Sequence, residues 1–301
     1  MVDVAEPTGD GVRVRVASAG ICGSDLHLVD SQAVDGTTLG HEIAGYTDAG
    51  TAVAVEPVVS CGACACCIAG DNGLCADALP QLIGIGRDGG MAEQVLVPEH
   101  LLVALPSGID VMNASLVEPL AVTVRSLHRA GVHDGADVAV IGGGSIGLCA
   151  VAVARHMGAR VELLARHEHQ LEAGARLGAV PATDAPVPIV IEAAGTESAL
   201  AAAVEKAAPK GTVGIPGTYW DPVTLPGMLM GVKEVSLVPS AMYGRTTGPR
   251  DVDVAAHILA DEPGIADVLV THRFPLDGAP EAFAVAADRS HGAIKVVLEP
   301  S

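Results

Sequence analysis

Apolar positions recur in short runs along the chain, and the spacing within each run predicts its secondary structure. Residues 12–17, V-R-V-R-V-A, alternate between apolar and polar side chains, which predicts a half-exposed strand. Residues 138–141, V-A-V-I, are followed at once by glycines and then by an apolar run over 148–153, which predicts a buried strand, a tight turn and a helix. The chain therefore predicts an α/β fold. Similar runs predict further strands and helices at 161–165, 189–195, 198–208, 211–217, 234–240, 271–276 and 293–298.

The glycines after the strand at 138–141 fit the pattern G-x-G-x-x-G, with Gly142, Gly144 and Gly147 as the three glycines. A strand, this turn and a helix N-terminus form the context that a dinucleotide-binding fingerprint requires. Gly142 makes the turn, Gly144 lets the backbone approach a pyrophosphate, and Gly147 lets helix and strand pack closely. With Ser145 and Ile146 they are predicted to bind the phosphates through free N–H groups and the positive helix end. An ordinary glycine-rich turn is the alternative.

Composition and charge narrow the class of protein. The 301 residues suffice for two domains, and half of them are hydrophobic. The formal charge of −19 repels nucleic acid and anionic membranes, which argues against both as partners. The N-terminus has no basic run followed by an apolar stretch, and no apolar run reaches the roughly 18–20 residues of a membrane span. We therefore expect a cytoplasmic protein.

Five of the seven cysteines lie between residues 61 and 75. In a chain that is not exported, such clustering favours metal binding over disulfides. Cys61, Cys64, Cys67 and Cys75 form C-x2-C-x2-C-x7-C, and four thiolates can close a tetrahedral structural zinc site. Cys66 has no partner in this scheme.

A second group of metal ligands is spread over two earlier motifs. Cys22 lies in G-I-C-G-S-D-L-H, and His41 and Glu42 lie in G-H-E. Three protein ligands that leave a fourth position open are the arrangement of a catalytic zinc site. Each residue alone is more often a packed or structural residue, so the prediction depends on their combination.

The motifs follow one another in a set order that resembles the zinc-dependent medium-chain dehydrogenases, and most of all their sorbitol, threonine and butanediol dehydrogenase branch. The resemblance extends from about Val12 to Pro300. It implies a GroES-like, mostly-β catalytic domain (1–121 and 258–301) and a Rossmann-fold cofactor domain (122–257). Its motifs are G-I-C-G-S-D-L-H (20–27), G-H-E (40–42), the cysteine lobe, D-G-G-M-A-E (88–93), V-E-P-L-A-V (117–122) and G-G-G-S-I-G (142–147).

The resemblance implies that Cys22 and His41 bind the catalytic zinc. It offers two candidates for the third ligand. Glu42 follows the histidine, and Glu118 matches a glutamate beside the metal in polyol-type relatives. The sequence does not rank one above the other.

The resemblance also implies a path for the substrate proton. Ser24 matches the hydroxyl that takes the proton, His27 matches the outer end of this relay, and Asp25 matches a carboxylate that orients the zinc-bound histidine. Zinc acts as a Lewis acid on the alcohol oxygen, and the nicotinamide accepts the hydride. The alternative is that Ser24 and Asp25 are only turn residues, and Arg125 stands where many relatives carry a histidine.

Two segments are shorter than in relatives. Nineteen residues separate His41 from Cys61, about ten fewer than usual, so Y-T-D-A-G-T-A must make a tight turn. Between Ala179 and Ile189 the chain reads V-P-A-T-D-A-P-V-P, and three prolines forbid a helix there. At roughly 3.3 Å per residue these nine residues span about 30 Å, enough to cross the sheet without a helix. We expect one crossover helix to be missing, and the uncovered sheet face to be covered by another subunit.

The end of the second strand of the nucleotide domain predicts which cofactor is used. Relatives that use NAD carry an acidic residue there, whereas this chain has Ala165, eighteen residues after Gly147. Arg166 suits a 2′-phosphate, and His167 and the nearby His169 can add donors. We therefore expect NADP(H) rather than NAD(H). The alternative is that Glu168 takes the acidic role.

The sequence as a whole predicts a Zn2+-dependent oxidoreductase that transfers a hydride between a small-molecule alcohol, or the matching aldehyde or ketone, and NADP(H). A catalytically inactive NADP(H)-binding redox sensor or structural protein is the alternative. The strand at 234–240 pairs between subunits in relatives, so we expect a homodimer or homotetramer. Trp220 lies in a loop that faces the nicotinamide in relatives. The sequence does not specify the substrate.

Overall fold

The computed structural model describes residues 2–33, 36–245 and 248–300. The chain divides into two compact units, Met1–Glu118 with Gly244–Ser301, and Pro119–Tyr243. The return to the first unit comes at Gly244, whereas the sequence placed it at residue 258. The reason is helix α8 (Asp251–Asp261), which packs against strand β5 (Leu102–Ala104) of the first unit.

Arg250, at the N-cap of α8, explains why this helix belongs to the first unit. Its guanidinium donates to Glu56 Oε2 at 3.2 Å, to the His100 carbonyl at 3.0 Å and to the Leu102 carbonyl at 3.0 Å. It also forms two hydrogen bonds with Asp253 in the first turn of the helix. The buried Glu56 therefore anchors the start of α8 to the sheet.

The first unit is built on a seven-stranded sheet in the order β12-β13-β1-β2-β3-β5, with β4 also paired to β1. One edge of β1 pairs with β4 over its first half and with β13 at its end, while β2 occupies the other edge. The pairing is antiparallel except between β12 and β13. The remaining strands are β1 (Val12–Gly20), β2 (Glu42–Thr47), β3 (Ala52–Val55), β4 (Gln94–Val97), β12 (Val270–Pro275) and β13 (Lys295–Glu299).

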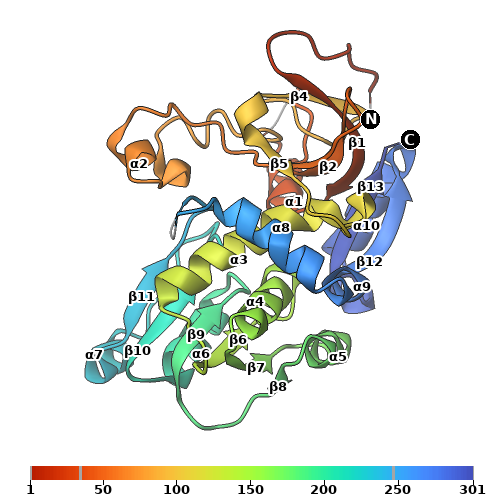
Figure 1. Cartoon of the computed structure of the whole chain (residues 1–301). Helices are drawn as coiled ribbons and strands as arrows, with labels where there is room; N and C mark the ends of the chain where they lie inside the picture. Colours follow the sequence, from red (N-terminus) through yellow and green to blue (C-terminus); the bar gives the residue numbers. More distant parts are fainter. Residues whose placement is uncertain (1, 34–35, 246–247, 301) are drawn as a thin grey trace. The chain divides into compact units, whose positions relative to one another are not determined.

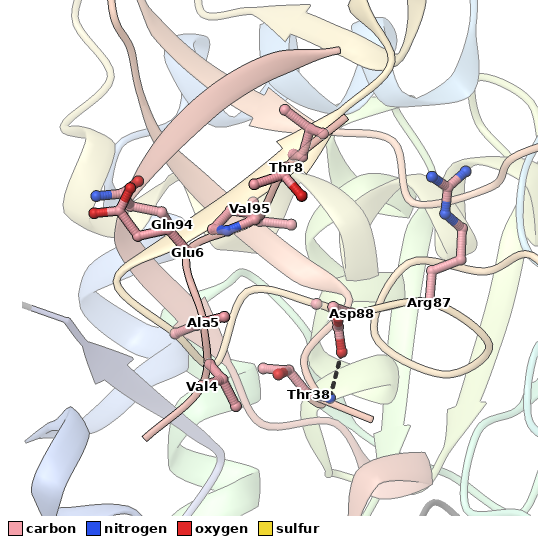
Figure 2. Close-up of a pocket in the computed structure, with 13 residues that line it drawn as sticks. Val4, Ala5, Glu6, Thr8, Thr38, Arg87, Asp88, Gln94 and Val95 are labelled. Atoms are coloured by element: carbon pink, nitrogen blue, oxygen red, sulfur yellow. Dashed lines mark hydrogen bonds between the residues drawn. The ribbon is translucent and has the colours of Figure 1, made fainter. Parts of the chain in front are cut away.

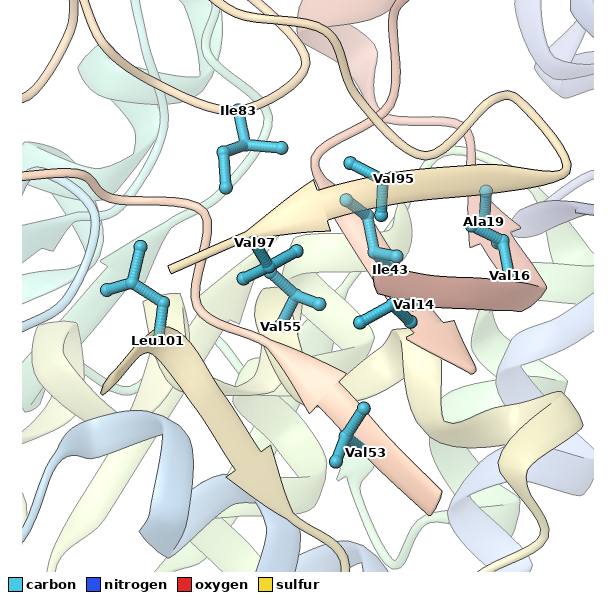
Figure 3. Packing of buried hydrophobic residues seen from close by; sticks show 10 residues of the cluster. All are labelled: Val14, Val16, Ala19, Ile43, Val53, Val55, Ile83, Val95, Val97 and Leu101. Carbon is cyan, nitrogen blue, oxygen red and sulfur yellow. The ribbon is translucent and has the colours of Figure 1, made fainter. Parts of the chain in front are cut away.

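The alternation predicted over residues 12–17 places Val14 and Val16 of β1 in an aliphatic core, which Ala19 joins after a register shift in the strand (Figure 3). Each such side chain contributes about 1.5–3 kcal/mol when it leaves water. The turn between β2 and β3 is as tight as the shortened sequence predicted, since Gly50 N donates to the Thr47 carbonyl and Gly50 has φ +79°. The core residues shown are Val14, Val16, Ala19, Ile43, Val53, Val55, Ile83, Val95, Val97 and Leu101.

Short helices complete the first unit. Its other α-helices are α1 (Gly23–Asp30), α2 (Ala65–Ile68), α9 (Gly264–Leu269) and α10 (Ala279–Ala287). Its 3-10 segments are η1 (Asn72–Leu74), η2 (Glu99–Leu101), η3 (Val111–Leu116), η4 (Leu276–Gly278) and η5 (Arg289–His291).

The second unit contains a six-stranded parallel sheet in the order β11-β10-β9-β6-β7-β8 (Figure 1). The chain runs outward from β6 through β7 to β8, returns to β9 beside β6, and runs outward again, so the order reverses between β6 and β9. Dinucleotides bind at such a switch point in this kind of sheet. The strands are β6 (Asp137–Ile141), β7 (Arg160–Leu164), β8 (Val180–Pro181), β9 (Val187–Glu192), β10 (Ala207–Ile215) and β11 (Ser236–Pro239). The helices are α3 (Val117–Ala130), α4 (Ser145–His156), α5 (Glu168–Arg176), α6 (Glu197–Lys206) and α7 (Gly227–Lys233).

The predicted loss of one crossover helix is confirmed. Residues 182–186 connect β8 to β9, and this described segment forms no helix. The buried Lys206 at the end of α6 holds the connection instead, because its Nζ donates to the carbonyls of Thr183 at 2.7 Å and Ala185 at 2.6 Å. The same Nζ lies 2.6 Å from Glu162 Oε2, and Glu162 also accepts the Thr183 hydroxyl. One lysine thus fixes the linker at two of its carbonyls.

A groove of about 310 Å³ lies along this linker. It is lined by the linker and by residues of β6, β7, β8 and β9, among them Arg160, Val180 and Pro186. Its occupation by another subunit stays a prediction. In the part of the chain that the structure describes, no helix combines the length and apolarity that crossing a bilayer requires.

Candidate functional site

The turn from β1 into α1 positions Cys22. Cys22 is the N-cap of α1, in extended conformation, and its backbone N–H donates to Asp25 Oδ2 at 2.8 Å. An acidic residue at this third helical position stabilises the helix start. Asp25 is fully buried, so the capping bond fixes both side chains relative to the end of β1.

Antiparallel pairing of β1 with β2 brings His41 and Glu42 close to Cys22, since Gly20, at the end of β1, pairs with Glu42. The ligand atoms of Cys22, His41 and Glu42 lie within 4.8 Å of one another. Ser24 Oγ is 3.4 Å from His41 Nε2. Two motifs far apart in sequence therefore form one cluster.

The opposite nitrogen of the His41 ring faces a carboxylate. His41 Nδ1 lies 3.5 Å from Asp25 Oδ1, and both side chains are buried. Burial lowers the pKa of His41, but the thiolate of Cys22 and the carboxylate of Asp25 outweigh it, so the pKa is raised well above its ordinary value. The cluster therefore favours a cation. Zn2+ prefers cysteine and histidine ligands, so this donor set fits zinc, and the Asp25 carboxylate lies on the other side of the His41 ring.

Glu42 also forms a buried ion pair that the sequence did not predict. Lys295 Nζ on β13 donates to both carboxylate oxygens of Glu42, at 2.6 and 2.7 Å, and to the Ile21 carbonyl at 3.1 Å. Glu42 and Lys295 are both buried. A Cβ at Gly20 would lie 1.9 Å from Glu42 Oε2, so only glycine leaves room for this carboxylate. The sequence signal was a single lysine within the apolar run A-I-K-V-V-L.

The other predicted residues lie farther from this cluster. Glu118, in the first turn of α3, is buried but is not part of the set of close ligand atoms. His27 lies three residues after Ser24, about one turn along α1, and its side chain is exposed. Arg125 is buried in α3.

The four predicted cysteines of the lobe come together around α2. The Sγ atoms of Cys61, Cys64, Cys67 and Cys75 lie within 4.8 Å of one another. Two of the distances, 3.5 Å for Cys64–Cys67 and 3.9 Å for Cys61–Cys67, are near the spacing of about 3.8 Å in a zinc tetrathiolate with bonds of about 2.3 Å. Backbone N–H groups that donate to its sulfur lower the pKa of Cys61 to about 7. The lobe therefore fits zinc, and Cys66 lies outside the set.

The glycine-rich turn has the shape that a pyrophosphate site needs. Gly142 has φ +108°, and a Cβ at Gly147 would lie 1.8 Å from the Gly142 carbonyl. By contrast, nothing lies within 4 Å of a Cβ position at Gly144, the N-cap of α4. Ser145 Oγ, in the first turn of α4, is buried and has no hydrogen-bond partner within the described ranges. Open space, a free hydroxyl and a helix N-terminus suit a phosphate.

Ala165 lies against this turn. A Cβ at Gly143 would lie 2.7 Å from Ala165 Cβ and 2.6 Å from Gln170 Cβ, so the middle glycine of G-G-G is also required, which the fingerprint alone did not indicate. Arg166 follows Ala165 and is exposed. His167 is the N-cap of α5, and its ring stacks on that of His169 at 5.4 Å.

The first unit also has a groove of about 510 Å³ beside the N-terminal segment (Figure 2). Asp88 closes one side of it by accepting the Thr38 N–H at 2.9 Å. Of the thirteen lining residues, none belongs to the metal or cofactor sets. This groove is therefore separate from the predicted chemistry.

Comparison with known proteins agrees with this geometry. Residues 8–107 match the alcohol dehydrogenase GroES-like domain, and residues 145–257 match the zinc-binding dehydrogenase domain. The galactitol 1-phosphate 5-dehydrogenase of Escherichia coli (strain K12) is 30% identical over 97% of this chain and 93% of its own. The sorbitol dehydrogenase of Bacillus subtilis (strain 168) is 28% identical over 97% and 91%.

Two solved structures are similar over nearly the whole chain. A putative zinc-binding dehydrogenase from Sinorhizobium meliloti 1021, bound to NADP, has a TM-score of 0.86 and 30% identity, covering 99% of this chain and 94% of its own. An alcohol dehydrogenase from Escherichia coli CFT073, complexed with NADH, has a TM-score of 0.87 and 26% identity over 99% and 94%.

Fold and site together define a zinc-binding oxidoreductase with a nucleotide-binding domain. The chain belongs to the zinc-dependent medium-chain dehydrogenases. The predicted GroES-like and Rossmann-type domains are confirmed. As an enzyme, it is a zinc-dependent alcohol dehydrogenase that uses NAD(P).

Proposed function

We propose that this protein oxidises polyols, or reduces the matching carbonyl compounds, with NADP(H) and a zinc ion held by Cys22, His41 and Glu118. The observation that carries the proposal is the buried cluster in which Cys22, His41 and Asp25 converge. Its two anionic groups favour a cation at His41, and its ligand atoms are those that zinc prefers.

Lys295 supports Glu118 as the third ligand. The ammonium group already occupies both oxygens of Glu42. A metal ion that recruited Glu42 would separate a buried ion pair and leave Lys295 uncompensated, which is costly. Glu118, buried in the first turn of α3, supplies the remaining carboxylate.

Each residue near the metal site has a distinct task. When bound, zinc supplies a Lewis acid for the substrate oxygen. The Ser24 hydroxyl is beside His41 Nε2, so it can accept the substrate proton at its Oγ. The exposed His27, one turn along α1, passes the proton to water. Asp25 holds the His41 ring so that Nε2, rather than Nδ1, faces the metal.

The end of β7 supports NADP(H). Ala165 offers no carboxylate to bind a ribose hydroxyl or to repel a 2′-phosphate. The exposed Arg166 can pair with that phosphate. The NADP-bound relative from Sinorhizobium meliloti is consistent with this choice, and the NADH-bound relative shows why it needs a direct test.

The names of the relatives suggest the substrate class. Galactitol 1-phosphate and sorbitol, on which the two named relatives act, are both polyols. We infer that a polyol, with or without a phosphate, is the substrate.

We further infer a cytoplasmic homodimer or homotetramer. Among the residues that the structure describes, strand β11 pairs only with β10 and lies at the edge of its sheet, and Met228 and Val232 on the preceding helix α7 are strongly exposed. None of the seven cysteines forms a disulfide, which suits a reducing compartment. Light scattering coupled to gel filtration measures the mass directly.

Initial rates with a panel of polyols and phosphorylated polyols test this function. We expect NADPH formation with at least one polyol, and no turnover from Cys22→Ser. A folded, fully metal-loaded protein that binds NADPH but turns over no alcohol and reduces no carbonyl compound would support the inactive sensor or structural protein instead.

A further inference from the structure

One buried carboxylate joins two loops at the carboxyl edge of the parallel sheet. Glu192, the last residue of β9, is fully buried. Its Oε1 accepts the N–H groups of Ala194 at 2.8 Å and Gly195 at 2.9 Å, and its Oε2 accepts the hydroxyl of Tyr219. Tyr219 lies in the loop after β10, so the bond connects the segments that follow two adjacent strands.

The same segments contact the glycine-rich turn. The Cβ position of Gly142 lies 2.9 Å from Ala194 N, and Ala193 N donates to the Ile141 carbonyl. The loops after β6, β9 and β10 therefore form one connected layer, and Glu192 lies at its centre.

The topology says which half of a dinucleotide this layer meets. The sheet order reverses between β6 and β9, and a dinucleotide lies across that switch point. Its adenosine half lies toward β7, where Ala165 touches the glycine-rich turn. The nicotinamide half must therefore extend over β9 and β10, on the side of Glu192 and Tyr219.

The hydrogen bonding of Glu192 and Tyr219 suits a fixed support for the loop after β10. Within the described ranges, the three groups that hydrogen-bond to Glu192 are all donors, so its oxygens accept in each bond. Burial and the bond to Glu192 raise the pKa of the Tyr219 hydroxyl, so the phenol stays a donor over the working pH range. Hydrogen bonds to a charged acceptor are stronger than those between neutral groups. The bond to Glu192 therefore holds Tyr219, which directly precedes the half-exposed Trp220, firmly in place.

We infer that Glu192 and Tyr219 are positioning residues, which hold the loop Gly217–Trp220 as a wall for the nicotinamide half of the cofactor. The inference rests on cofactor binding at the glycine-rich turn, and not on the preference for NADP(H). It predicts that breaking the bond weakens binding of the whole dinucleotide but leaves binding of its adenosine half unchanged.

The test compares Tyr219→Phe with wild type, using the reduced dinucleotide that wild type binds more tightly. Titration calorimetry should show about a ten- to hundredfold rise in Kd for that dinucleotide, the effect of one lost hydrogen bond to a charged group. The Kd for 2′,5′-ADP or 5′-AMP should stay within about twofold. Cofactor quenching of Trp220 emission should be reduced. Tyr46→Phe, in the first unit, is the matched control and should change none of these.

A conservative variant of Glu192 separates the effect of holding Tyr219 in position from the effect of the negative charge. Glu192→Gln keeps an acceptor for both N–H groups and an amide that can bond the Tyr219 oxygen, so it should bind the dinucleotide nearly as wild type does, whereas Glu192→Ala should not. If Tyr219→Phe leaves the dinucleotide Kd and the Trp220 signal unchanged, or weakens the adenosine fragment equally, the inference is wrong. Failure of wild type to bind any dinucleotide would instead contradict the proposed function.

Discussion

Lys295 and Glu42 form a buried ion pair in which the ammonium nitrogen lies 2.6 and 2.7 Å from the two carboxylate oxygens. The side chains are only 3% and 1% exposed. This pair gives the sheet of the first unit a charged contact at the metal cluster, to which Glu42 itself belongs. It also distinguishes the two candidate third ligands, because the ammonium group already occupies both carboxylate oxygens of Glu42.

Removing the ammonium should therefore destabilise the fold. Lys295→Met leaves Glu42 charged and buried, which costs about 3–5 kcal/mol of unfolding free energy, and thermal melting should show it. Lys210→Met is the matched control, since Lys210 is 82% exposed and 4.0 Å from Glu234. Equal melting of the two variants would show that the pair contributes nothing.

The two metal sites should be separable by mutation. Cys61→Ser opens the four-thiolate site and should lower the melting temperature, because structural zinc contributes directly to folding. Cys22→Ser should abolish turnover with a smaller loss of stability. Cys66→Ser, outside both sets, is the control. If Cys61→Ser ends activity without a change in melting, the two sites have been assigned the wrong way round.

Lys206 should stabilise the trimmed crossover. Burial disfavours the charge of Glu162, but hydrogen bonds from Lys206 and Thr183 outweigh it and lower its pKa. The stabilisation is therefore present above the ordinary carboxyl pKa and is lost as pH falls below it. Lys206→Met should cost about 3 kcal/mol at neutral pH in urea unfolding.

The exposed pair of Arg160 and Asp137, 65% and 51% exposed, provides the control for Lys206. It borders the same groove, and Arg160→Met should cost less than about 1 kcal/mol. A Lys206→Met variant as stable as Arg160→Met would mean that the linker needs no anchor.

Glu56 should make stability depend on pH. Burial raises its pKa to about 7, although Arg250 opposes the shift. A raised pKa favours the folded state most at low pH, so this contribution is lost as pH rises from about 4.5 to 7. The loss amounts to about 3 kcal/mol for one group. Glu56→Gln should remove this pH dependence. The difference in unfolding free energy between variant and wild type should therefore grow between pH 4.5 and 7. A constant difference contradicts the assignment.

Cofactor choice should depend on the two residues after β7. Arg166→Ala should raise the Michaelis constant for NADPH about tenfold and leave that for NADH nearly unchanged. Ala165→Asp should favour NADH by adding a ribose acceptor and repelling the 2′-phosphate. Glu168→Ala tests the alternative acidic residue. A wild type with equal or better kcat/KM for NADH shows that this strand end was misassigned.

The features that the sequence predicted well are local. The spacing of the glycines, the four cysteines and the prolines before Ile189 restricts neighbouring residues directly, so the turn, the lobe and the missing helix follow from short segments. Strand ends were less accurate. The strand predicted at 211–217 is β10, Ala207–Ile215, because the parallel pairing with β9 begins earlier than the apolar run.

The features that the sequence did not predict are pairs far apart in the chain. Lys295 and Glu42 are 253 residues apart, Lys206 and Glu162 are 44 apart, and Tyr219 and Glu192 are 27 apart. No periodicity or spacing links such residues, and only the sheet order brings them together. The lone lysine in an apolar strand was a usable signal, since a buried ammonium requires an anionic partner.

Zinc content measured together with turnover tests the central claim most directly. Wild type should contain about two zinc ions per chain and form NADPH with a polyol, whereas Cys22→Ser should contain about one and form none. A chelator that removes one zinc should stop wild-type turnover, and added Zn2+ should restore it. Undiminished turnover from Cys22→Ser, or from wild type stripped of that zinc, would contradict the claim that this protein is a dehydrogenase acting through zinc at Cys22 and His41.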